Sequence, residues 1–78
     1  ICGTGIGISI AANKFNNIRC ALIHNTFTSS MAKKHNNANV IALGSKIIDE
    51  MEAYKIINIF LNTDFEGGRH ITRLNKLK

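Results

Sequence analysis

Aromatic residues are scarce in this 78-residue sequence, which has no tryptophan and one tyrosine. Nucleic-acid bases stack on aromatic rings, so few rings means few stacking platforms. The net charge is +5, but the ten lysines and arginines are scattered, with a cluster only at the C-terminal end. We read this charge as a solvated surface or as part of a site for a small phosphate-bearing substrate, and we expect no nucleic acid partner.

Cysteine is also rare, and long apolar runs are absent. Cys2 and Cys20 are too few for a disulfide framework, and their spacing does not match a CxxC metal pair. Free thiols favour a reducing compartment, so we expect a cytoplasmic protein. No run reaches the roughly 18 apolar residues of a membrane helix, so we expect no membrane partner. The length allows one small domain, residues 1–78.

The chain is organised around its first nine residues, where Cys2 is followed by glycines at positions 3, 5 and 7. An apolar helical pattern begins directly afterwards, which indicates a strand end, a tight loop and a helix start. Glycine allows close approach of a ligand, and a helix start attracts anions and favours a thiolate. This pattern predicts a nucleophile or base beside an anion cradle. The spacing alone also fits a tight strand-to-helix turn with Cys2 as a small buried residue.

Strand-like and helix-like segments alternate along the rest of the chain. We expect a strand end at 1–2, a helix at 6–14, a strand at 18–24, a helix at 28–36, a strand at 40–43, a helix at 49–62, a loop at 63–68 and a basic helix at 69–78. This order predicts an α/β fold with a parallel sheet covered by helices on both faces. Ligands of such sheets bind beyond the carboxyl ends of the strands.

The sequence also predicts the N-cap of the second helix and the apolar face of the third. Thr26 or Thr28 is the expected N-cap of the second helix. The third helix is expected to present one apolar stripe, formed by Met51, Tyr54, Ile57, Phe60 and Leu61.

The polar residues of the second half are either ordinary surface groups or members of a binding site. His24 and His35 lack metal-ligand spacing with a cysteine or carboxylate, so we expect no metal. Arg69 and Arg73 are four residues apart and share a helix face. They are either part of a solvated surface or a pair of guanidinium groups that bind a phosphate.

Four segments together resemble one family. CGTGIGISIAANK, IRCAL, HNNANVIALGS and FEGGRH, with a second arginine four residues after the first, follow one another in the order and spacing of B-type ribose-5-phosphate isomerases. That family also includes galactose-6-phosphate and allose-6-phosphate isomerases. The resemblance implies an α/β/α sandwich around a Rossmann-like parallel sheet, and a homodimer whose active sites draw on both subunits. It further implies a cofactor-free and metal-independent aldose–ketose isomerase that passes a proton between carbons 1 and 2 through a cis-enediol.

The resemblance assigns the base and the loop. Cys2 matches the cysteine that acts as base, whereas some relatives place a glutamate where this chain has Ile8. Thr4 and the loop amides match the groups that hold the enediolate oxygen. These amides belong to Gly3, Gly5, Ile6 and Gly7.

The resemblance also assigns the second half of the site. His35 matches the histidine of ring opening, Asn36 a substrate-contacting neighbour, and Arg69 and Arg73 the phosphate-binding arginines. Family members begin with a strand ending in an Asp-His pair, which these residues do not include. We therefore expect residues 1–78 to be the C-terminal part of one isomerase domain, with little or no activity alone.

Three other functions stay open. The first is a hexose 6-phosphate isomerase of the same family. The second is a non-catalytic phosphate- or nucleotide-binding module of Rossmann type. The third is a nucleic-acid binder, which would show steep salt dependence.

Overall fold

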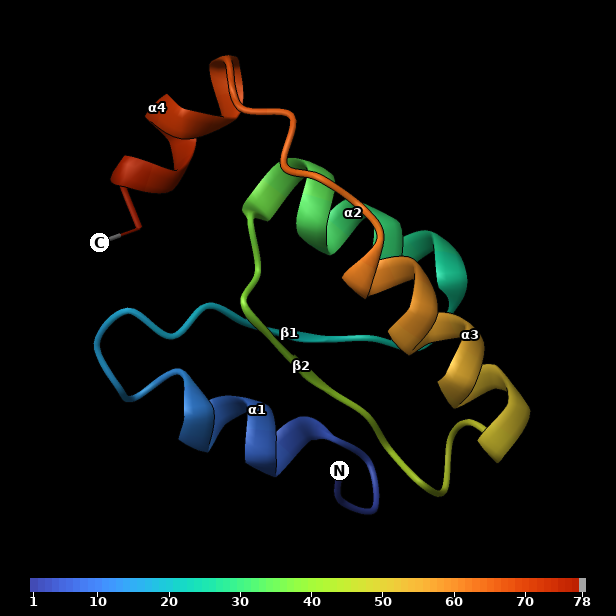
Figure 1. Ribbon diagram of the computed structural model, residues 1–78. Helices are drawn as coiled ribbons and strands as arrows, with labels where there is room; N and C mark the ends of the chain where they lie inside the picture. Colours follow the sequence, from blue (N-terminus) through green and yellow to red (C-terminus); the bar gives the residue numbers. More distant parts are fainter. Residues whose placement is uncertain (78) are drawn as a thin grey trace.

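A computed structural model describes residues 1–77 and contains four helices and two strands in those residues (Figure 1). Along the chain these are α1 (Ile6–Ala12), β1 (Cys20–Leu22), α2 (Thr26–Asn36), β2 (Val40–Ala42), α3 (Glu50–Leu61) and α4 (Arg69–Asn75). The order matches the alternation expected from the sequence. The last helix ends at Asn75, earlier than expected, and position 78 of the expected helix lies outside the described residues.

The strands are parallel, with Cys20 opposite Val40. The strand end expected at residues 1–2 is a single parallel bridge between Cys2 and Gly44. The carbonyl of Ala42 accepts from the Ile23 amide, whereas the next carbonyl along the chain accepts from the Cys2 amide. Successive carbonyls of a strand point to opposite sides, so β2 lies between β1 and the Cys2 segment.

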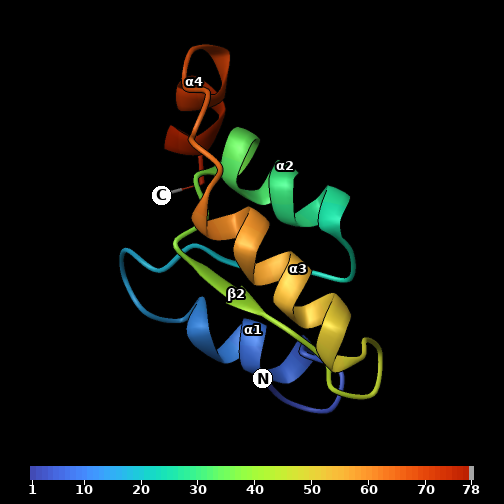
Figure 2. The ribbon, with the colours of Figure 1, turned by 45° about the vertical axis from the view of Figure 1, so that its right-hand side comes forward.

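Helices cover both faces of this sheet. α1 lies on one face, and α2 and α3 pack against each other on the opposite face (Figures 1 and 2). The three-layer α/β/α arrangement expected from the sequence is therefore confirmed. None of the helices in residues 1–77 has the length and apolar character needed to cross a bilayer.

Asparagine and aspartate, rather than threonine, cap the two longest helices. The Asn25 side chain accepts from the Thr28 amide at 2.8 Å, and the Thr28 hydroxyl accepts from the Asn25 amide in return. The expected cap at Thr26 or Thr28 is therefore wrong by one to three positions, since Thr28 is the partner inside a capping box. Asp49 caps α3 by accepting from the Glu52 amide at 2.8 Å.

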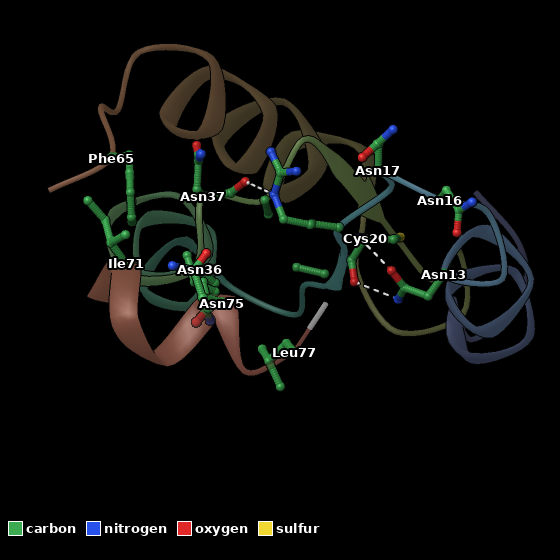
Figure 3. A pocket seen from close by; sticks show the side chains of 14 residues that line it. Asn13, Asn16, Asn17, Cys20, Asn36, Asn37, Phe65, Ile71, Asn75 and Leu77 are labelled. Atoms are coloured by element: carbon green, nitrogen blue, oxygen red, sulfur yellow. Dashed lines mark hydrogen bonds between the residues drawn. The ribbon is translucent and has the colours of Figure 1, made fainter. Parts of the chain in front are cut away.

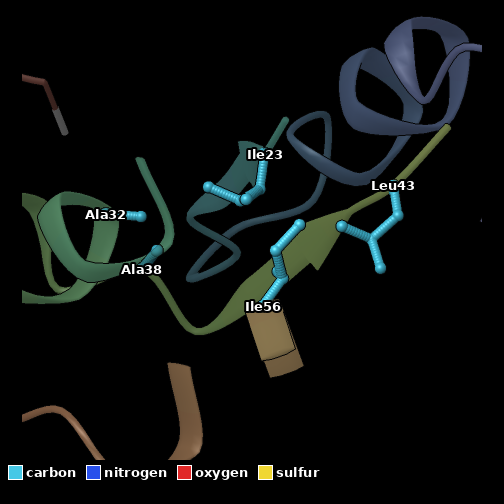
Figure 4. Packing of buried hydrophobic residues seen from close by; sticks show 5 residues of the cluster. All are labelled: Ile23, Ala32, Ala38, Leu43 and Ile56. Carbon is cyan, nitrogen blue, oxygen red and sulfur yellow. The ribbon is translucent and has the colours of Figure 1, made fainter. Parts of the chain in front are cut away.

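The core lies between the sheet and the α2–α3 layer. Its buried members come from α2, α3, the residues directly after each strand and the connection before β2: Ile23, Ala32, Ala38, Leu43 and Ile56 (Figure 4). The buried Ser29 hydroxyl donates to the Ile56 carbonyl at 2.8 Å and ties the two helices together.

The face that α3 buries differs from the expected stripe. Ile56 is fully buried, with Ala53 and Phe60 packed against the same core. Met51 and Tyr54, by contrast, are 69% and 66% exposed. The prediction was therefore right for Phe60 and wrong for Met51, Tyr54 and Leu61. It failed there because α3 carries apolar residues on most of its circumference, so a 3.6-residue period fits more than one face.

Candidate functional site

Cys2 lies where its strand segment ends and the glycine loop begins. Its side chain is half-buried, and its sulfur accepts a hydrogen bond from the Gly5 amide at 3.1 Å. The backbone amides of Ile8, Gly5 and Thr4 lower the pKa of the Cys2 thiol, and partial burial opposes them. The loop thus stabilises the thiolate, which is the nucleophilic and basic form of cysteine.

The loop is anchored to the chain that follows β2. Ser45 donates its amide to the Cys2 carbonyl at 2.8 Å, and Lys46 donates to the Gly3 carbonyl at 2.9 Å. The aliphatic stem of Lys46 also passes within 3.7 Å of the point where a Gly3 Cβ would lie. This places a cationic side chain against the loop, a feature that sequence reasoning missed because Lys46 lies more than forty positions from the loop.

Glycine is required at two points of this site. Gly5 has φ of 81°, and a Cβ there would lie 2.6 Å from the Leu22 side chain. Gly44 faces Thr4 so closely that a Cβ would lie 2.5 Å from the Thr4 carbonyl oxygen. Sequence reasoning placed Gly44 at the end of a strand, on the ligand-binding edge of the sheet, but missed its contact with Thr4. Gly7, in contrast, sits inside α1 with open space around it.

The polar groups on the loop are few and point outward. Thr4 is exposed, and its hydroxyl accepts from the Ile6 amide at 3.3 Å. Ser9 donates its hydroxyl to the Ile6 carbonyl at 2.7 Å. Thr4 and the first turn of α1 therefore share one surface beside the Cys2 sulfur.

A second polar cluster joins the end of α2 to α4. The rings of His35 and His70 stack with centroids 4.3 Å apart and planes at 18°. Arg73 donates through Nη2 to the His35 carbonyl and lies 3.3 Å from His70 Nδ1. Glu66 Oε1 lies 3.7 Å from His35 Nε2 and 3.8 Å from His70 Nε2. The fold thus brings His35 and Arg73 together, as two of the predicted site residues.

His70 and Glu66 are members of this cluster that sequence reasoning missed as functional residues. Their spacing of four residues, in a segment that leads into a helix, was the available signal. His70 is buried, and this burial lowers its pKa, as do His35, Arg69 and Arg73, against an opposing effect of Glu66. The arrangement therefore favours a neutral imidazole at position 70.

The two histidines and the glutamate are close enough to raise the question of a metal ion, since their ligand atoms lie within 4.8 Å of one another. Zinc needs nitrogen lone pairs that converge at about 2.0–2.1 Å. Nearly parallel stacked rings direct their lone pairs along parallel planes, and the Arg73 guanidinium adds a positive charge beside His70. The donor set therefore fits a hydrogen-bonded cluster better than a metal centre.

An open hollow of about 930 Å³ lies between α4 and the start of β1 (Figure 3). Several asparagines and apolar side chains of α4 line it, and Asn36 alone among the predicted site residues does so. Asn13 and Cys20 exchange two hydrogen bonds at its wall, of 2.8 and 2.9 Å. Cys20 is half-buried, and burial raises its pKa, which opposes thiolate formation there.

The predicted site residues form two groups at opposite edges of the sheet. Cys2 and its loop lie beyond the carboxyl ends of the parallel strands. His35 and Asn36 end α2 directly before β2 begins, and α4 with Arg69 and Arg73 packs at that same edge (Figure 1). One copy of this chain therefore does not bring the Cys2 loop to the His35–Arg73 cluster.

Comparison with known proteins gives consistent matches. The Ribose/Galactose Isomerase family profile matches residues 1–77. The Bacillus subtilis protein YwlF is 51% identical over 77 residues, which cover 99% of this chain and 52% of that protein. The D-erythrulose-4-phosphate isomerase of Pectobacterium atrosepticum is 47% identical over 77 residues, covering 99% of this chain and 51% of that protein.

Solved structures agree with this result. The type B ribose 5-phosphate isomerase of Trypanosoma brucei superposes with a TM-score of 0.96 at 47% identity, over 99% of this chain and 52% of that one. Ribose-5-phosphate isomerase B of Mycoplasma genitalium, with bound ribulose-5-phosphate, superposes with a TM-score of 0.95 at 43% identity, over 97% and 50%. The chain spans about half the length of the relatives it matches. On its sequence and on its fold, it belongs to the Ribose/Galactose Isomerase family.

Proposed function

We propose that the protein carrying this chain interconverts an aldose phosphate and a ketose phosphate, with ribose 5-phosphate and ribulose 5-phosphate as the first candidate pair. The observation that carries the proposal is the Cys2 sulfur held 3.1 Å from the Gly5 amide at the start of α1. A thiolate beside the backbone N–H groups of a helix start fits the removal of a proton next to a carbonyl. Family membership adds the substrate class.

The chemistry can be written with the groups of the loop. In the open-chain aldose, the Cys2 thiolate takes the proton from carbon 2, and the electron pair moves onto the oxygen of carbon 1. The resulting cis-enediolate carries negative charge, which the loop amides and Thr4 stabilise. The hydroxyl proton of carbon 2 then moves to the oxygen of carbon 1, the carbonyl forms at carbon 2, and Cys2 returns its proton to carbon 1. No electrons leave the sugar, so the reaction requires no redox cofactor.

The second cluster has the groups for the remaining tasks. His35 transfers the proton that opens the sugar ring, and Asn36 contacts the substrate beside it. Arg69 and Arg73 hold the phosphate, which gives the protein a remote handle whose binding energy orients the reacting end. Arg69 and Arg73 are exposed on one side of α4, and this exposure supports the assignment.

A complete site under this proposal needs the Cys2 loop of one copy and the His35–Arg73 cluster of another. The two groups lie at opposite edges of the sheet, which supports a homodimer with two shared sites. The 78 residues alone, taken as the C-terminal part of an isomerase domain, are expected to lack robust turnover.

A panel of sugar phosphates tests the function. We expect the protein that carries this chain to isomerise ribose 5-phosphate, and iodoacetamide to inactivate it unless substrate is present. Turnover of a hexose 6-phosphate in preference to the pentose would favour the galactose or allose type, and a preference for a tetrose phosphate would match the Pectobacterium relative. Phosphate binding without turnover, unaffected by alkylation of Cys2, would instead support a non-catalytic Rossmann-type module.

A further inference from the structure

His70 is a buried titratable side chain to which the proposed reaction assigns no task. It is 7% exposed, the lowest exposure of any titratable residue in the part of the chain that the structure describes. It faces charged or titratable groups on each side: Arg73 and Arg69 on its own helix, Glu66 on the preceding loop and His35 at the end of α2. A buried imidazole in this setting needs a defined proton position.

The contact with Arg73 fixes that position. Arginine carries only donors, so at 3.3 Å from Arg73 Nη2 the Nδ1 atom of His70 must be the acceptor. The proton of the neutral ring is then on Nε2, the atom that faces Glu66 Oε1 at 3.8 Å. Burial and three neighbouring positive or titratable groups disfavour the doubly protonated ring, which agrees with this tautomer.

The same contacts constrain His35. Its ring lies flat on the His70 ring, and the Glu66 oxygen that faces His70 is also the one 3.7 Å from His35 Nε2. The Glu66 backbone is held in turn, since its amide donates to the Lys34 carbonyl at 3.0 Å. His70 therefore contacts both the His35 ring itself and Glu66, the carboxylate that faces that ring.

We propose that His70 is a positioning residue for His35: as a neutral ring with its proton on Nε2, it supports the His35 ring by stacking and aligns Glu66 and Arg73 around it. This assignment rests on the proposed function, in which His35 opens the sugar ring. It predicts that His70 matters for a cyclic substrate and much less for an open-chain one.

Net conversion of the sugar and proton exchange from the open-chain ketose separate these cases. Ribose 5-phosphate closes to a furanose, whereas ribulose 5-phosphate cannot, because the oxygen needed for a five-membered ring carries the phosphate. The variant His70→Asn keeps an acceptor near the Nδ1 position for Arg73 but loses the stacked ring and the Nε2 donor. We expect it to lower kcat for ribose 5-phosphate by about tenfold or more, with KM within about twofold of wild type. Exchange of the carbon-1 proton of ribulose 5-phosphate with heavy water, which needs no ring step, should stay within about twofold of wild type.

Two further variants sharpen the test in the intact protein. Glu66→Gln is expected to show the same selective loss, and His24→Asn, at an exposed histidine in another loop, is expected to change neither conversion nor exchange. Equal losses of conversion and exchange, or no loss of either, would overturn the positioning role. If the unmodified protein turns over neither sugar, the proposed function itself has failed. Nitrogen chemical shifts of the imidazoles give a readout independent of activity, and a His70 ring protonated on Nδ1 would contradict the assignment.

Discussion

The Gly5 amide points at the Cys2 sulfur across 3.1 Å, and this contact couples the acidity of the thiol to the shape of the loop. Gly5 reaches this position only because its φ of 81° is open to glycine. The sulfur therefore has a hydrogen-bond donor that any change of the loop backbone would displace. The first three predictions follow from this coupling.

Replacement of the thiol should separate binding from chemistry. We expect Cys2→Ala to lower kcat by at least about 10²-fold, because a positioned base contributes about that much. Binding of the sugar phosphate, measured by calorimetry, should stay close to wild type, since Arg69 and Arg73, the proposed phosphate ligands, lie elsewhere. Cys20→Ser is the matched control, and wild-type turnover by Cys2→Ala would disprove the role of the thiol.

The two cysteines should differ in reactivity. The loop amides lower the pKa of Cys2, whereas burial raises that of Cys20. The thiolate of Cys2 is therefore populated at lower pH, and iodoacetamide should label Cys2 first at pH 7. Mass spectrometry over a pH series checks this order. Faster labelling of Cys20 would show that the loop does not activate Cys2.

A side chain at position 44 should displace the glycine loop that Gly44 faces. A Cβ on Gly44 would lie 2.5 Å from the Thr4 carbonyl oxygen, so Gly44→Ala must push the loop away from the sheet. We expect a loss of about 1–3 kcal/mol in the free energy of unfolding and slower alkylation of Cys2. Gly7→Ala, within α1 and in open space, should instead stabilise by up to about 1 kcal/mol. Equal effects of the two substitutions would contradict this account.

The sequence was sufficient to predict the order of the elements because each strand and helix has a local signature. The strands expected at 18–24 and 40–43 contain β1 and β2, and the helix expected at 28–36 lies within α2. The glycine spacing likewise placed Cys2 beside the start of α1. These signals depend only on neighbours within a few positions, so they can be recognised in the sequence without knowledge of the tertiary structure.

The parts that sequence reasoning missed depend on residues far apart in the chain. His35 meets Glu66 and His70 only because α4 returns to the end of α2, a separation of more than thirty positions. The contact of Gly44 with Thr4 has the same origin. The buried face of α3 was missed for a different reason, because its period does not show which of two apolar faces meets the core.

The corrected face of α3 gives a direct comparison of two adjacent isoleucines. Ile56 is fully buried in the core (Figure 4). Ile57, by contrast, is 36% exposed. Ile56→Ala should lower the free energy of unfolding by about 2–5 kcal/mol, since it leaves a cavity. Ile57→Ala should cost about 1 kcal/mol or less. Denaturant titrations measure both changes. A larger loss of unfolding free energy at Ile57 would support the apolar stripe that was expected from the sequence.

The buried imidazole of His70 should make stability depend on pH. Its pKa is lowered in the folded chain by burial and by His35, Arg69 and Arg73, while Glu66 acts in the opposite direction. In an unfolded chain a histidine titrates near about 6.5. As the pH falls through that value, the unfolded state takes up a proton that the folded state still refuses, so the free energy of unfolding falls.

Substitution can identify the histidine that makes the free energy of unfolding depend on pH. His70→Phe keeps an aromatic ring against His35 but cannot be protonated, so its unfolding free energy should vary less between pH 7 and pH 5 than that of the unmodified protein. His24→Phe removes an exposed histidine and should leave the slope as it was. Denaturant midpoints at several pH values measure the difference. An unchanged slope in His70→Phe, together with a flattened one in His24→Phe, would assign the effect to the exposed ring and contradict a neutral, buried His70.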